Sequence, residues 1–84
     1  MANTKVGVVS HYYDKIGVVV IDVAKKLSVG DKIKFVKGKE DLFEQVIDSM
    51  EFDHKKIQSA KKGEEVGMKV SKPVKKGVEV FKVG

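Results

Sequence analysis

Apolar and polar positions alternate with a period of two along most of the chain. In the cleanest case Ile33 and Phe35 share one face of a segment whose other face carries Lys32 and Lys34. Such short, β-branched segments separated by turn residues are typical of strands. The pattern predicts strands over residues 5–13, 18–23, 32–37, 66–70 and 78–83.

The segment 18–23 (VVVIDV) differs from its neighbours because its apolar run is continuous. A continuous β-branched run is typical of a strand that is covered on both faces. We therefore expect residues 18–23 to form a central strand with little exposed apolar surface.

One segment has a different period. Its apolar residues are spaced as on one face of a helix, and Asp41 would serve as its N-cap: Leu42, Phe43, Val46, Ile47 and Met50. A long strand with a bulge is the competing interpretation, since a bulge lets both faces carry apolar side chains. Pattern alone favours the helix over 42–54 and leaves the strand open.

Length and composition narrow the class of protein. The chain has 84 residues, so we expect a single domain over 1–84 with a thin core. It contains no cysteine, which excludes disulfides and thiol chemistry. Residues 1–4 are not followed by the apolar stretch of a secretory signal, and no apolar run is long enough to span a bilayer. We expect a cytoplasmic protein without a membrane partner.

The charge is basic and unevenly distributed. All 17 cations are lysines, the 12 acids leave a net charge of +5, and residues 40–53 hold six acids and no lysine. A basic surface favours RNA, ribosome or acidic-protein partners, although a solvated lysine-rich surface is an equally good explanation. Lysine lacks the planar fork of arginine, so contact with a nucleic-acid backbone is favoured over base readout.

The sequence holds no convincing catalytic or metal-binding pattern. It lacks a phosphate-binding P-loop, so we expect no nucleotide. His11 and His54 are 43 positions apart, and neither has ligands at zinc-site spacing. Ser10 and His11 are neighbours on a predicted strand and should point to opposite faces. We expect a non-enzymatic protein with no catalytic residue, metal or cofactor.

Aromatic and basic residues supply the candidate RNA contacts. Tyr12 and Tyr13 lie beside Lys15 at the end of a predicted strand, where aromatic rings can stack on bases. The alternative is that one tyrosine packs into the core while the other faces solvent. Lysine doublets in predicted loops would add phosphate contacts: Lys55, Lys56, Lys61 and Lys62.

Several motifs resemble the second domain of elongation factor Tu and its archaeal and eukaryotic counterparts. Residues 27–35 (LSVGDKIKF) are similar to that family's strand with a preceding glycine turn. The stretch 49–67 (SMEFDHKKIQSAKKGEEVG) resembles a longer family motif without a gap. Together with Ile16-Gly17 and the 75–77 turn (KKG), these motifs follow the family's order over nearly the whole chain.

The resemblance implies an all-β fold, a small closed six-stranded antiparallel Greek-key barrel of the translation-protein type. It makes 42–53 a strand, against the helical spacing. The chain looks like a stand-alone translation elongation factor-like protein, and a similar barrel occurs as an accessory domain of collagenase-like peptidases.

The function that the resemblance implies is association with tRNA, ribosomal RNA or the ribosome. The family's pocket for the aminoacylated end of tRNA falls on Glu51, Asp53, His54 and Glu65. Three of these are acidic and would repel phosphate. The alternative is a protein-interaction or accessory module whose partner is a protein.

Overall fold

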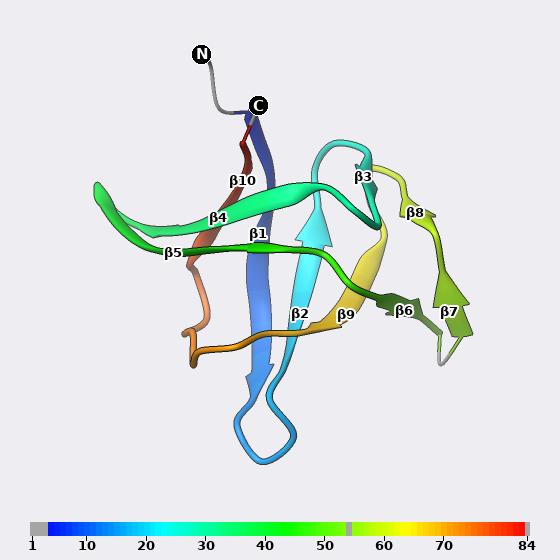
Figure 1. Ribbon diagram of the computed structural model, residues 1–84, viewed down its shortest axis with the longest axis horizontal. Coiled ribbons are helices and arrows are strands. Elements are labelled where there is room, and N and C mark those ends of the chain that lie inside the picture. Colours follow the sequence, from blue (N-terminus) through cyan, green and yellow to red (C-terminus); the bar gives the residue numbers. More distant parts are fainter. Residues whose placement is uncertain (1–3, 54, 84) are drawn as a thin grey trace.

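The computed structural model describes residues 4–53 and 55–83, and within them it contains strands and turns but no helix (Figure 1). The ten strands are β1 (Thr4–Tyr13), β2 (Val18–Val23), β3 (Leu27–Ser28), β4 (Lys32–Lys37), β5 (Glu40–Val46), β6 (Met50–Phe52), β7 (Lys55–Ile57), β8 (Ser59–Ala60), β9 (Glu65–Lys69) and β10 (Glu79–Lys82). None of the described residues belongs to a helix that could cross a membrane.

Eight strands form one antiparallel sheet in the order β5-β4-β10-β1-β2-β9-β6-β7, and β3 pairs with β8 in a separate small sheet. β1 and β10 are neighbours, and Thr4 is the register partner of Lys82. The start of β1 and the end of β10 therefore lie at the same corner of the molecule (Figure 1). The sheet curves strongly, so that β4 and β5 cross over β1 and β2 in this view.

The all-β prediction is confirmed, and the predicted strands agree closely with the structure. β2 and β4 have the predicted bounds, while β1, β9 and β10 differ by one residue at one or both ends. Residues 27–28, 55–57 and 59–60 form three additional short strands that the pattern did not indicate.

The helix that the spacing after Asp41 favours is wrong, and the alternative of an extended segment with a bulge is correct. The region forms two strands, β5 and β6, separated by residues 47–49. The register shifts between Phe35, which pairs with Phe43, and Val36, which pairs with Asp41. Leu42 is thus the extra residue of a bulge, and a bulge is what produces adjacent apolar positions in an extended segment. The Phe35 and Phe43 rings stack with their centroids 4.7 Å apart.

The expected closed six-stranded barrel is not found among the described residues. Their backbone ladders leave β5 and β7 as the two end strands of the sheet. The segment that follows β9 approaches β5, but a glutamine side chain rather than a backbone ladder joins the two. The curvature brings these segments together without bringing them to the roughly 4.8 Å spacing at which strands pair directly.

The core lies on the concave face and is entirely apolar among the described residues. Val19, Ile21 and Val23 are buried along β2, whereas Val18 and Val20 on its other face remain partly exposed. The expectation that β2 is covered on both faces is therefore wrong for this chain. An antiparallel sheet commonly packs one face on its core and leaves the other open, and β2 follows that rule despite its continuous apolar run.

Candidate functional site

The convex side of the sheet carries a continuous row of outward-facing side chains. His11, Val20, Gly67, Glu51 and Lys56 are successive register partners across β1, β2, β9, β6 and β7. A second row joins Tyr13, Val18 and Lys69. Directly paired residues lie on one face of a sheet, so these eight residues form one surface, here named the outer-face surface.

The β1–β2 part of this surface is aromatic and apolar. The His11 and Tyr13 rings lie 5.6 Å apart at a tilted angle, and Tyr13 is 48% exposed. Val18 and Val20 lie beside them on β2. Exposed aromatic and β-branched groups that lie together on a sheet face are typical of a surface that contacts another molecule.

The β9–β6–β7 part is polar and slightly hollowed. A pocket of about 320 Å³ lies here, and Val18, Glu51, Lys56 and Gly67 are among the residues that line it. Glu51 and Lys56 face each other across the β6–β7 ladder, so opposite charges stand at one end of the pocket. Because Gly67 has no side chain, the backbone of β9 is accessible at that point.

An acidic pair lies on the same face. Asp22 and Glu65 are direct register partners on β2 and β9. Like charges placed directly opposite each other in a ladder are destabilising. No cation pairs with either residue within the described part of the chain, so this pair is suited to a cationic group from outside.

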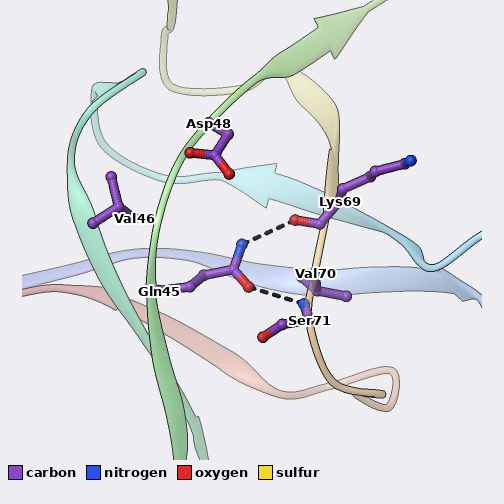
Figure 2. Close-up of a pocket in the computed structure, with 6 residues that line it drawn as sticks. All are labelled: Gln45, Val46, Asp48, Lys69, Val70 and Ser71. Atoms are coloured by element: carbon purple, nitrogen blue, oxygen red, sulfur yellow. Dashed lines mark hydrogen bonds between the residues drawn. The ribbon is translucent and has the colours of Figure 1, made fainter.

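A second pocket, of about 390 Å³, lies where β5 approaches the segment after β9 (Figure 2). Gln45 Nε2 donates to the Lys69 carbonyl oxygen at 2.9 Å, and the Ser71 amide donates to Gln45 Oε1 at 3.2 Å. The two bonds enclose Val70 in the pattern of a parallel ladder. The side-chain amide therefore makes the two bonds that the N–H and the C=O of one residue of a neighbouring strand would make, and this junction is named the Gln45 seam.

Of the predicted RNA contacts, only Tyr13 and Lys56 belong to the outer-face surface, and the others lie elsewhere. Tyr12 packs against the core, whereas Tyr13 belongs to the outer-face surface. Lys15 is in the β1–β2 turn, and Lys55 and Lys56 are on β7. Lys61 and Lys62 lie between β8 and β9. Figure 1 shows the β1–β2 turn well apart from β7 and β8.

The four positions implied by the tRNA-end resemblance are only partly together. Glu51 and Glu65 point outward from neighbouring strands, because Glu51 pairs with Gly67, two residues from Glu65. Asp53 follows β6 with a φ of 54°, in the left-handed region that asparagine and aspartate tolerate. His54 lies outside the described residues.

Ser10 and His11 make separate contacts with the main chain. The Ser10 hydroxyl donates to the Val20 carbonyl oxygen at 3.3 Å, and His11 Nδ1 lies 2.8 Å from the Ser10 carbonyl oxygen. In neither contact does the Ser10 hydroxyl bond to the His11 imidazole, as a nucleophile would bond to its general base. Within residues 4–53 and 55–83, no group of three or more His, Asp or Glu side chains has the arrangement of a metal site.

Sequence reasoning missed the residues that define both sites. Gln45 is one of three amide side chains in the chain and stands inside the acidic segment 40–53, which was its only distinguishing signal. The continuous apolar run predicted that Val18 and Val20 are core residues. Their strand register and their partial exposure show that they face outward.

Comparison with known proteins gives a consistent family. Residues 3–78 match the model of the peptidase family U32 C-terminal domain. An uncharacterized protease of Methanocaldococcus jannaschii is 35% identical over 77 residues, which is 92% of this chain and 19% of that protein. The chain thus spans about a fifth of the length of this relative.

Solved structures agree on the fold. The C-terminal domain of a U32 peptidase from Geobacillus thermoleovorans superposes with a TM-score of 0.88 at 20% identity, covering 96% of this chain and 93% of that one. Its selenomethionine variant gives a TM-score of 0.84 at 20% identity, covering 90% of this chain and 95% of that one.

These matches correct the family and the function expected from the sequence. The kinship with elongation factor Tu is wrong, and with it the translation elongation factor-like role. An RNA or ribosome partner stays a prediction. The expectation of a non-enzymatic protein is contradicted as well, because the chain matches the C-terminal domain of a peptidase family and a relative named as a protease. The shorter motifs that suggested translation factors contain glycine turns before strands, at Gly17, Gly30 and Gly77. Such turns meet a local backbone requirement and do not identify a function.

Proposed function

The chain belongs to the peptidase family U32 C-terminal domain family, and we propose that it serves in peptide hydrolysis beside the catalytic region of a U32-type peptidase. The observation that carries this proposal is the match over residues 3–78, together with 35% identity to a much longer protein named as a protease. In this proposal the outer-face surface contacts the catalytic region, and that region cleaves the peptide bond.

The character of the outer-face surface supports a protein contact. Its β1–β2 part presents His11 and Tyr13 beside two valines of a run whose composition is that of a buried strand. Contact with a second protein surface would bury Val18 and Val20 and remove their apolar area from water. Tyrosine near the centre of an apolar patch is a common anchor of such interfaces.

The test adds the 84-residue chain to the catalytic region of a U32-type peptidase produced without its own C-terminal domain. Binding is measured by calorimetry, and cleavage of an unfolded polypeptide is measured with and without the chain. We expect the chain to bind and to raise the cleavage rate. Tyr13→Ser should weaken binding by about fivefold or more, while Lys39→Ser in the β4–β5 turn should leave it unchanged.

Two results would contradict the proposal. A chain that neither binds the catalytic region nor alters its rate has no part in this hydrolysis. A chain that cleaves the polypeptide alone carries the catalytic groups itself, and the supporting role assigned to the outer-face surface would then be wrong.

A further inference from the structure

The Gln45 seam leaves backbone groups available on both of its sides. On the β9 side, the Val70 amide donates to the Gly17 carbonyl oxygen, away from β5. Backbone groups alternate in direction along an extended chain, so the Lys69 carbonyl and the Ser71 amide face the seam. Gln45 occupies these two groups, and it does so with a side chain that is free to move away.

The β5 side presents a free strand edge. Val46 pairs with Lys32, whose carbonyl oxygen accepts from the Val83 amide on the opposite side of β4. Lys32 and Val46 therefore form a pair without mutual hydrogen bonds. The backbone N–H and C=O of Val46 point away from β4, toward the free edge of the sheet. By the same alternation, those of Glu44 also point outward. No ladder among the described residues covers this edge.

The charge and polarity around the seam indicate what would fit. Asp48 lines the pocket, lies beside the segment that follows β5 in Figure 2, and makes no ion pair with any described residue. The ammonium group of Lys69 points away from Gln45 in the same view. Val46 is 49% exposed at the rim. A peptide with alternating cationic and apolar side chains matches Asp48 and Val46.

We propose that the Gln45 seam receives an extended, lysine-bearing polypeptide segment as an added strand between β5 and residues 69–71. The segment bonds to the backbone groups of Glu44 and Val46 on one side. On the other side it takes over the Lys69 carbonyl and the Ser71 amide, from which the Gln45 amide withdraws. Strand addition of this kind gains affinity from the backbone and selectivity from alternate side chains.

The inference rests on the proposed function in naming the segment, which would be the polypeptide substrate of the peptidase. Binding at the seam is nevertheless measured on the 84-residue chain alone. A failure at the seam is therefore distinguishable from a failure of the chain to act on the catalytic region.

The experiment uses three eight-residue peptides and backbone amide spectra of the chain. One peptide alternates lysine with valine, the second has glutamate in place of lysine, and the third is the lysine peptide with alternate backbone nitrogens methylated. We expect the first to bind and to slow hydrogen exchange at the Glu44 and Val46 amides. The other two should bind at least about fivefold more weakly, through charge repulsion at Asp48 and loss of donors respectively.

Two substitutions with matched controls locate the effect. Gln45→Ala should raise affinity for the lysine peptide by about threefold to tenfold, because the peptide no longer displaces two hydrogen bonds. Gln58→Ala, which removes an exposed amide elsewhere, should change nothing. Asp48→Asn should reduce the preference for lysine over glutamate by about threefold, whereas Asp14→Asn in the β1–β2 turn should preserve it.

Three outcomes would overturn the inference. In the first, the methylated peptide binds as well as the unmethylated one, which means that charge alone holds it. In the second, Gln45→Ala lowers affinity although its spectrum shows a folded chain, so that the amide is part of the binding surface instead of its gate. In the third, Glu44 and Val46 become protected as the chain is concentrated without peptide, so that a second copy of the chain occupies the edge.

Discussion

The centre and the ends of the large sheet are built in different ways. In the centre, β1, β2 and β9 pair over five or six residues each, with one bulge in β1 between Val9 and His11. Most of their inward side chains are fully buried. At the ends, β5 carries a bulge, β6 and β7 are three residues long, and one glutamine joins β5 to the segment after β9. The central strands are paired on both sides, whereas β5 and β7 are each paired on one side only.

This difference indicates where stability and recognition are located. Long ladders with a buried face tolerate no change of register, because a shift by one residue would turn every apolar side chain outward. Short end strands with accessible edges cost little to rearrange and offer unpaired backbone groups. We infer that the centre maintains the fold and that the ends and the convex face carry the binding surfaces.

The largest expected effect comes from shortening one isoleucine in each region. Ile21 on β2 is fully buried, and Ile57 on β7 is only partly buried. Ile21→Ala should lower the free energy of unfolding by about 2–5 kcal/mol, because it leaves a cavity in the core. Ile57→Ala should cost roughly 1 kcal/mol or less, since less apolar surface is lost there. Urea denaturation followed by fluorescence or circular dichroism measures both. Equal losses would show that the ends are as tightly integrated as the centre.

The next effect separates two glycines with different surroundings. A Cβ at Gly7 would lie 2.7 Å from the Asp22 carbonyl oxygen, whereas a Cβ at Gly67 would be 3.5 Å from its nearest neighbour, Val18 Cγ1. Gly7→Ala should therefore destabilise the chain by about 1–3 kcal/mol through overpacking. Gly67→Ala should stay within about 0.5 kcal/mol. Thermal unfolding compares the two variants, and a harmless Gly7→Ala would show that β1 and β2 can separate to admit a methyl group.

The smallest effect concerns charge on the convex face. Glu65→Gln relieves the repulsion from Asp22 directly opposite and should raise stability by a few tenths of a kcal/mol, up to about 1 kcal/mol. Glu51→Gln removes the charge opposite Lys56 and should shift stability by a similar amount in the other direction. Chemical denaturation at low and high salt measures both shifts, which salt should reduce. Shifts of the same sign in the two variants would contradict this assignment of charge pairs.

The sequence predicts the centre of the sheet well, for a physical reason. Alternation with period two located β4, and a continuous β-branched run located β2, each with the bounds that it has in the structure. The bulge at Leu42 disrupts that alternation and imitates a helix, so pattern alone failed there. Two-residue strands such as β3 and β8 are too short to show any period.

The candidate sites were less predictable because they depend on register and curvature. The continuous apolar run of β2 does not tell whether Val18 and Val20 are covered by the chain's own residues or by another molecule. Gln45 acquires its role only because the curved sheet brings β5 near residues 69–71, which are more than 20 positions away in sequence. The family was misjudged because strand-turn motifs recur wherever a glycine must precede a strand.

The pairing of Thr4 with Lys82 has a mechanical consequence. A load applied across the two chain ends would pull β1 and β10 apart from their shared corner, breaking the rungs of that ladder one after another instead of shearing them together. The domain should thus yield to modest force at this corner, and a tether attached to both ends would peel it open before stretching it.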